Sequence, residues 1–227
     1  MDHRQILQAR KNSKTRLARP FENFLESFNQ CEKAGEALLK GAFEPEFIPL
    51  LERSIVISAV TAIEVYYRDM LDGIFKYCSP EFFEPKLKYL HAEKYDIVEL
   101  LNVYRHGIHP LELVSQNQSF QNTDQIERVF SKFLGKGFWD SVLNLQVRLK
   151  EKPEGIITWS NDDLEGLKAT FTLRHELIHN PARAAFLTQR VLDNLNNSFN
   201  IVFGSDLLLA KVMTDNQDPT LKDEIAS

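Results

Sequence analysis

The residues with the clearest chemical potential lie in one short segment, residues 173–180, which reads Leu-Arg-His-Glu-Leu-Ile-His-Asn. This segment contains two overlapping patterns. Arg174, followed five residues later by His179, combines a permanent cation with a group that exchanges protons near neutral pH. His175, Glu176 and His179 also form His-Glu-x-x-His, which on a helix can bind zinc with the glutamate as general base. The two patterns predict different chemistries, one directed at phosphates and one dependent on zinc.

A helix over residues 161–179 is predicted to carry both patterns. Ser160 and the acids that follow it form an N-cap, and Pro181 disfavours helical conformation at the residue before it. On a helical projection, one stripe about 60° wide holds the apolar residues Leu164, Leu167, Phe171 and Ile178. Arg174 and His175 lie at the margins of this stripe, and His179 lies just outside it. Because buried polar groups cost free energy unless they are paired, these three residues are either satisfied structural residues or the walls of a site.

The zinc interpretation needs a third protein ligand, and the sequence offers no obvious one. No glutamate occurs between Glu176 and Glu224, and no histidine follows His179. Asp193 or Asp206 could serve only by coincidence. A zinc hydrolase is therefore the lesser alternative, and we expect a site with no metal and no cofactor.

The rest of the chain is predicted to be all-α, as a helical bundle. Glycine and proline are sparse, with nine of each among 227 residues, and alternating strand patterns are almost absent. A long central helix is expected from Pro45 to about Cys78, because its middle is apolar nearly all round. We expect 106–121 to be a loop. Further helices are expected at about 22–40, 94–105, 122–134, 137–149 and 182–203, the last one broken near Gly204.

Three segments are predicted along the chain. Residues 1–40 form a basic N-terminal arm and a helix, 41–212 form the main helical domain, and 213–227 form a flexible C-terminal tail. Between residues 3 and 19 the arm has six lysines and arginines, and no acid follows Asp2. Such a run is either a solvated surface or a contact with nucleic acid.

The composition limits the classes of partner. The net charge of −5 and the pI of about 5.7 argue against a strong duplex binder but allow a local basic site. Cys31 and Cys78 are far apart and lack metal-type spacing, which favours a reducing compartment. No apolar run reaches the roughly 18–20 residues that a membrane helix needs, and the N-terminus lacks a signal-type apolar core. We therefore expect a cytoplasmic protein with no membrane partner.

The order of these features resembles the HEPN superfamily. Three features carry the resemblance: the motif Arg174-His175-x-x-x-His179, its place near the end of a late helix, and an early apolar helix from Ser54 that bears the lone acid Glu64. The chain is most similar to the RiboL-PSP-type domains of bacterial defence and toxin systems. In these domains the motif often follows a Gln/Asn-bearing segment like 119–127. The likeness covers about residues 45–205.

The resemblance implies a metal-independent endoribonuclease in which the 2′-hydroxyl of the RNA attacks the adjacent phosphate. It implies that His179 transfers the proton and that Arg174 stabilises the charge on the phosphate. The two residues lie about 140° apart around a helix, so one helix presents them poorly to a single point. HEPN ribonucleases characteristically build the site between two subunits, which implies a homodimer. An RNA substrate and an antitoxin or sensor protein are the further partners implied.

Three supporting residues complete the predicted site. His175 is a candidate for positioning the substrate, and Asn180 for a polar contact at the end of the helix. Glu64 either orients the catalytic residues or forms an ordinary i,i+4 pair with Arg68. A HEPN-like domain that binds RNA, nucleotide or a partner protein without cleavage is the main alternative function.

Overall fold

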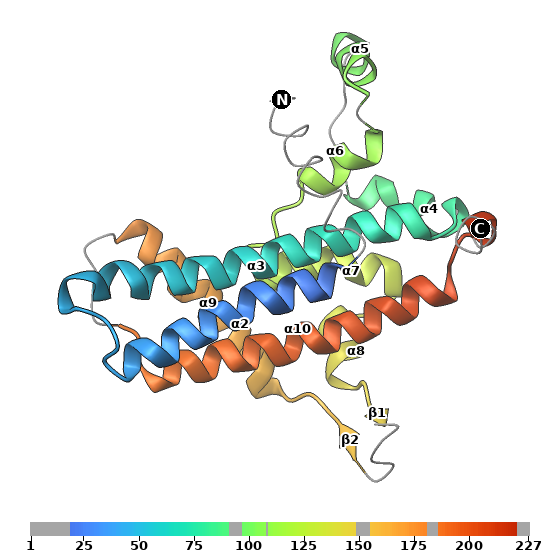
Figure 1. Ribbon diagram of the computed structural model, residues 1–227. Coiled ribbons are helices and arrows are strands. Elements are labelled where there is room, and N and C mark those ends of the chain that lie inside the picture. The colour runs from blue at the N-terminus through green and yellow to red at the C-terminus, as the bar shows by residue number, and fades with distance from the viewer. Residues whose placement is uncertain (1–18, 91–96, 108, 149–154, 181–185, 222–227) are drawn as a thin grey trace.

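The computed structural model describes residues 19–90, 97–107, 109–148, 155–180 and 186–221. Four long helices form the body of the molecule, and they confirm the predicted all-α class: α2 (Pro20–Leu39), α3 (Ile48–Tyr77), α9 (Asn161–His179) and α10 (Gln189–Asp215). Figure 1 shows α2, α3 and α10 side by side along the length of the molecule. α9 packs against both α10 and α3. The helix with the motif is thus part of the bundle.

Shorter elements surround this bundle. α7 packs against α4 and α8, and α6 packs against α3. Two short strands pair antiparallel, with Val147 opposite Ile157, and in Figure 1 they extend from the bundle on the side opposite α5. These elements are η1 (Pro45–Phe47), α4 (Pro80–Leu90), α5 (Ile97–Arg105), α6 (Pro110–Gln116), α7 (Thr123–Leu134), α8 (Phe138–Leu143), β1 (Val147–Arg148), β2 (Ile156–Ile157) and η2 (Pro219–Leu221).

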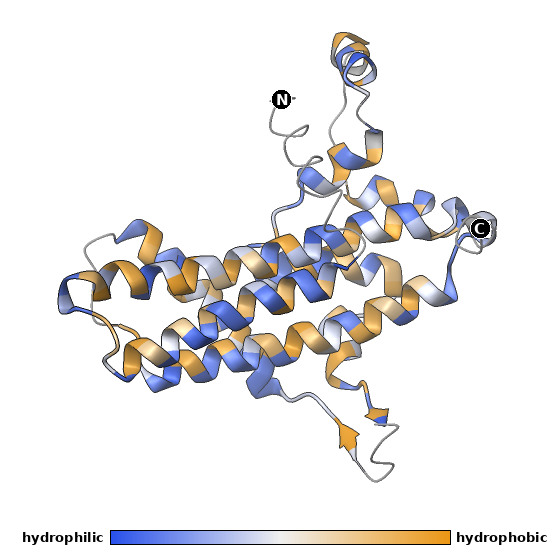
Figure 2. Ribbon diagram, in the orientation of Figure 1, coloured by the Kyte–Doolittle hydropathy of each residue, from blue (hydrophilic) through white to orange (hydrophobic). Residues whose placement is uncertain are grey.

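α3 is the central helix of the core, as its apolar sequence predicts. Ile63, Tyr67 and Leu71 are completely buried, and Figure 2 shows hydrophobic residues recurring along the helices of the bundle. The hydroxyl group of Tyr67 lies 2.9 Å from that of Ser205 on α10, so its polar end is satisfied inside the core. α3 therefore provides a rigid base for any residue that it carries.

The predicted break near Gly204 is wrong. α10 is continuous from Gln189 to Asp215, and it begins later than the predicted start at residue 182. Gly204 lies against the indole ring of Trp159, and a Cβ atom at this position would come within 2.7 Å of the ring. The indole Nε1 donates a hydrogen bond to the Asn200 carbonyl group over 2.6 Å. The glycine therefore allows close packing and does not end the helix.

The structure corrects the sequence predictions at three other places: an expected loop, the end of an expected helix and a helix that was not expected. The expected loop at 106–121 contains α6, which His109 caps by accepting the N–H of Leu111 over 3.2 Å. The helix expected at 137–149 ends at Leu143 and is followed by β1. α4 was not predicted at all, because Pro85 lies inside it and proline usually interrupts a helix.

Of the three predicted segments, the structure describes the helix of the first, most of the main domain and the start of the tail. Phe24 and Phe28 of α2 are buried in the same core as Tyr66, so the helix of the N-terminal segment is part of the bundle. The basic arm over residues 1–18 and the end of the tail, residues 222–227, lie outside the described residues. Among the helices that the structure describes, none combines the length and the apolar character needed to cross a membrane.

Candidate functional site

The start of α9 is fixed to α10 by caps and by close packing. Asp163 accepts hydrogen bonds from Ser160 N over 2.8 Å and from Asn200 Nδ2 of α10 over 3.1 Å. Gly166 lies so close to α10 that a Cβ atom would be 2.4 Å from Cβ of Asn197. The predicted range of 161–179 for this helix is confirmed. These contacts determine where the motif lies relative to the bundle.

The other end of α9 is fixed to α3. Ile178 was predicted to face the core, but it is 46% exposed, and Leu177 is buried instead against Val56 and Phe186. The difference arises because the last turn packs on the start of α3 and on the segment that precedes α10. Glu52 of α3, which is only 2% exposed, accepts the backbone N–H of Leu187 over 3.0 Å and of Phe186 over 3.4 Å. The first three residues of the predicted stripe are buried as expected, namely Leu164, Leu167 and Phe171.

Arg174 lies in a polar cluster built from three elements. Its Nη2 is 3.8 Å from Glu64 Oε1 on α3, which is an ion pair too long for a hydrogen bond. Its Nη1 donates to Gln121 Oε1, in the segment between α6 and α7, over 3.4 Å. Gln121 Nε2 donates in turn to Glu64 Oε2 over 3.5 Å. The cluster connects the motif helix to the central helix.

The charge of Glu64 responds to this cluster. Burial raises the pKa of the Glu64 carboxyl group, while Arg174, the Gln121 amide and Arg68 lower it. Glu64 was predicted either to orient the catalytic residues or to pair with Arg68. Its carboxylate faces Arg174, and Arg68, one turn later on α3, adds a weaker attraction. The Arg68 Nε atom is buried and has no hydrogen-bond partner among the described residues. Two guanidinium groups, those of Arg174 and Arg68, thus act on the Glu64 carboxyl group.

His175 and His179 lie side by side on the last two turns of α9. Their ring centroids are 4.4 Å apart, with an angle of 56° between the ring planes, and both residues are exposed. Within the part of the chain that the structure describes, no group of three His, Cys, Asp or Glu residues could hold a metal ion. A catalytic zinc takes three protein ligands, and this pair of imidazoles could provide two.

Asn180 ends α9 with a non-helical conformation, at φ −125° and ψ 79°. Its backbone N–H donates to the Glu176 carbonyl group over 2.8 Å. The side chain of Asn180 is exposed. The structure therefore places this residue at the helix end, as predicted, one position beyond His179.

A hollow of about 500 Å³ lies beside the motif. Arg174 and His175 both line it. Glu64 does not line the hollow but contacts Arg174, and the ring of His179 lies against that of His175. Within one chain, the structure thus brings Arg174, His175, Glu64 and Gln121 together but does not place His179 in the same hollow. The lining residues are Gln121, Asn122, Thr123, Asp124, Lys168, Phe171, Thr172, Arg174 and His175.

Gln121 is the site residue that the sequence did not single out. The only signal for it was its place in the Gln/Asn-bearing segment before α7, where Asn122 caps the helix by accepting the N–H of Gln125 over 2.8 Å. Local sequence patterns identify Asn122 as a helix cap, but they do not show what the side chain of Gln121 contacts.

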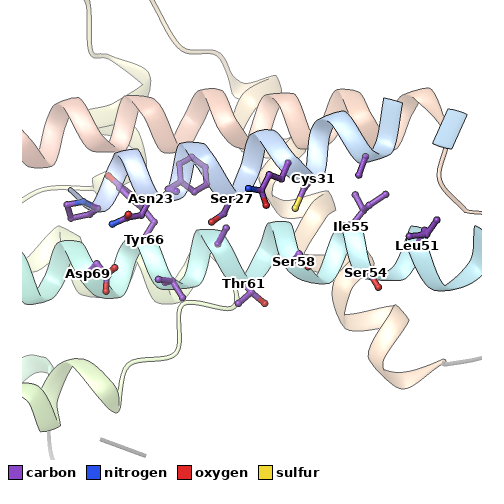
Figure 3. Close-up of a pocket in the computed structure, with 16 residues that line it drawn as sticks. Asn23, Ser27, Cys31, Leu51, Ser54, Ile55, Ser58, Thr61, Tyr66 and Asp69 are labelled. Carbon is purple, nitrogen blue, oxygen red and sulfur yellow. The ribbon is translucent and has the colours of Figure 1, made fainter. Parts of the chain in front are cut away.

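A second hollow, of about 570 Å³, lies between α2 and α3 (Figure 3). Serine and threonine side chains, such as Ser27, Ser58 and Thr61, line it together with apolar residues, and Tyr66 and Asp69 lie near one end. None of the candidate site residues lines this hollow. Among the described residues that line it, there is no histidine or arginine.

Comparison of the chain with protein families, with curated proteins and with solved structures found no match. Function is therefore inferred from the residues around α9 and their geometry. The described cluster provides a cation in contact with two neighbours and a pair of exposed imidazoles. These groups suit acid–base chemistry at a phosphate.

Proposed function

We propose that this protein is a metal-independent endoribonuclease that cuts RNA through Arg174 and His179. The observation that carries the proposal is the position of Arg174 in contact with Glu64 and Gln121, at the edge of a hollow that His175 also lines. A guanidinium group that is already oriented suits a phosphate whose charge grows in the transition state. Exposed imidazoles within one turn provide a group for proton transfer.

The proposed reaction uses the 2′-hydroxyl group of the substrate as nucleophile. His179 takes the proton from this hydroxyl, and the 2′-oxygen forms a bond to phosphorus. The bond from phosphorus to the 5′-oxygen breaks, the 5′-oxygen takes up a proton from water, and His179 then returns its proton to the solvent. Arg174 stabilises the charge on the non-bridging oxygens. The products are a 2′,3′-cyclic phosphate and a 5′-hydroxyl end.

A homodimer is part of the proposal. Arg174 and His179 lie about 140° apart on one helix, and His179 does not line the hollow beside Arg174. A second subunit across a two-fold axis could bring its own His179 to this hollow, which would complete the site. Single-stranded RNA is the proposed substrate, because unpaired strands allow the bend that in-line attack needs. An antitoxin or sensor protein is the proposed regulator, in a toxin or antiviral defence system.

The proposed compartment is the cytoplasm. Cys31 and Cys78 are both free and buried in the structure, and thiols persist in a reducing compartment. Burial raises the pKa of both thiols, that of Cys78 to about 11. They are therefore poor nucleophiles, and we assign them no part in the reaction.

The test is cleavage of an RNA and of its 2′-deoxy counterpart in excess EDTA, followed by analysis of the new ends. We expect the RNA to be cut to 2′,3′-cyclic phosphate ends and the deoxy substrate to stay intact. His179→Ala should lower the rate by about 10²–10⁴-fold, and Arg174→Ala by about 10²–10³-fold. His175→Ala should have a smaller effect. Loss of wild-type activity in EDTA, or equal cutting of the deoxy substrate, would contradict the mechanism.

One observation favours a second candidate function, a non-catalytic module that binds RNA, nucleotide or a partner protein. In a single chain the hollow contains Arg174, His175 and Lys168 but not His179, which suffices for binding an anion but not for the proposed proton transfer. Binding of a labelled RNA without cleavage, lost in Arg174→Ala and retained in His179→Ala, would support this alternative.

A further inference from the structure

Gln121 is the residue at the site to which the proposed reaction assigns no role. Its side-chain amide lies between Glu64 and Arg174, donating from Nε2 to the carboxylate over 3.5 Å and accepting at Oε1 from Nη1 over 3.4 Å. We infer that Gln121 is a positioning residue, which sets the direction in which the Arg174 guanidinium group faces the scissile phosphate. This inference rests on the proposed ribonuclease function.

The two neighbours of Gln121 allow one orientation of its amide. An ionised carboxylate only accepts hydrogen bonds, and a guanidinium group only donates them. A rotation of the amide by 180° would place its oxygen against Glu64 and its NH₂ group against Arg174, and both hydrogen bonds would be lost. Gln121 therefore connects an acceptor with a donor, which requires a side chain that has both functions.

The backbone on each side of Gln121 is anchored, although its side chain is exposed. Phe120 is completely buried, and its ring stacks on that of Phe130 at a centroid distance of 5.7 Å. On the other side, Asn122 caps α7 by accepting the N–H of Gln125. Because the backbone is already anchored, only the side-chain torsions of Gln121 have to be ordered when it contacts a neighbour, and this favours a defined geometry.

The contacts of Arg174 with its two neighbours do not use all of its N–H donors. The ion pair of Arg174 with Glu64 is 3.8 Å long, and the hydrogen bond from Arg174 to Gln121 is 3.4 Å long. Guanidinium has five N–H donors, and the hydrogen bond to Gln121 uses one of them. Gln121 thus restricts the direction of the group, and donors remain for a phosphate in the hollow that both residues line.

The experiment compares steady-state RNA cleavage by the wild type and four variants. We expect Gln121→Ala to lower kcat by about 10- to 100-fold with little change in KM, because a misdirected cation loses contacts made only in the transition state. Gln121→Asn keeps an amide on a shorter side chain and should restore part of this loss. Ser119→Ala, a change at an exposed position two residues earlier, is the matched control and should leave kcat unchanged. Arg174→Ala tests the proposed function itself.

A second readout measures Arg174 directly and does not depend on cleavage. The rotation of its guanidinium group is followed by ¹⁵N NMR in the wild type, Gln121→Ala and Ser119→Ala. We expect faster rotation only in Gln121→Ala. Unchanged rotation in that variant, or a kcat equal to that of Ser119→Ala while Arg174→Ala is inactive, would overturn the positioning role and leave the proposed function standing. If Arg174→Ala cleaves as well as the wild type, the proposed function fails, and the role of Gln121 in that reaction fails with it.

Discussion

Replacing Glu52 by glutamine tests how much this carboxylate, which takes no part in the proposed reaction, contributes to the stability of the protein. The Glu52 carboxylate is buried, and both of its oxygens accept backbone N–H groups from the segment that follows the motif, at 3.0 Å from Leu187 and 3.4 Å from Phe186. Glutamine has nearly the same shape but one acceptor oxygen. One of the two N–H groups must therefore face an NH₂ group and lose its partner.

The expected loss follows from these contacts. A hydrogen bond to a charged group contributes about 1.5–3 kcal/mol, and a buried donor without a partner costs about 1–3 kcal/mol. Because one of the two contacts is long, we expect Glu52→Gln to lower the free energy of unfolding by about 2 kcal/mol. Small domains have roughly 5–15 kcal/mol in total, so the variant should still fold.

The assay is urea denaturation at pH 7, with hydrogen exchange of the Phe186 and Leu187 amides as a local readout. The matched control is Glu22→Gln, since Glu22 forms an exposed ion pair of 2.8 Å with Arg19 and exposed pairs contribute about 0–1 kcal/mol. A loss below about 0.5 kcal/mol in Glu52→Gln, with unchanged exchange of both amides, would refute the anchoring role of this carboxylate.

Three further predictions follow from other contacts. Gly204→Ala should lower the free energy of unfolding by about 1–3 kcal/mol, because its Cβ would press on the Trp159 ring; urea denaturation checks this. Burial raises the pKa of Asp206 from 3.8 to about 6, so the folded state binds the proton more tightly than the unfolded state. Stability from this group is therefore complete below about pH 4 and lost as pH rises through about 6. Asp206→Asn should remove that dependence and stabilise the protein near pH 8 by up to about 3 kcal/mol, measured by denaturation across pH. Finally, burial raises the pKa of Glu64, so cleavage should weaken on the acid side as this carboxylate loses its charge beside Arg174. In Glu64→Gln this contribution should disappear and leave only the acid limb that proton transfer by an imidazole base produces, and a profile equal to that of the wild type would refute the role of the carboxylate.

Local signals predicted the elements that position the site. Pro45 and the apolar run from Ser54 predicted the central helix, and Ser160 and Pro181 predicted both ends of the motif helix, because caps and proline act within a few residues. These signals cannot report on partners that are far away in the sequence. Gly204 looked like a helix breaker because its contact with Trp159 is made only in the folded bundle.

The site shows the same limit. Arg174, His175 and His179 were recognisable because their spacing on one helix can be read directly from the sequence. Gln121 was not, because its partners are 57 residues before it and 53 residues after it. Glu64 was found only as a lone acid in an apolar helix. The structure shows that it faces Arg174, from a helix that is distant in the chain but adjacent in space.

The placement of Glu52 and Glu64 on one helix restricts how this sequence can change during evolution. Both carboxylates contact the region around the motif. Glu52 accepts a hydrogen bond from the segment after α9, and Glu64 lies beside Arg174. Deleting a single residue between them would turn one carboxylate by about 100° relative to the other and shift it by about 1.5 Å along the axis. Only one of the two could then keep its partners. Length variation should therefore accumulate in the connections between helices, whereas the stretch from 52 to 64 should diverge by substitution alone.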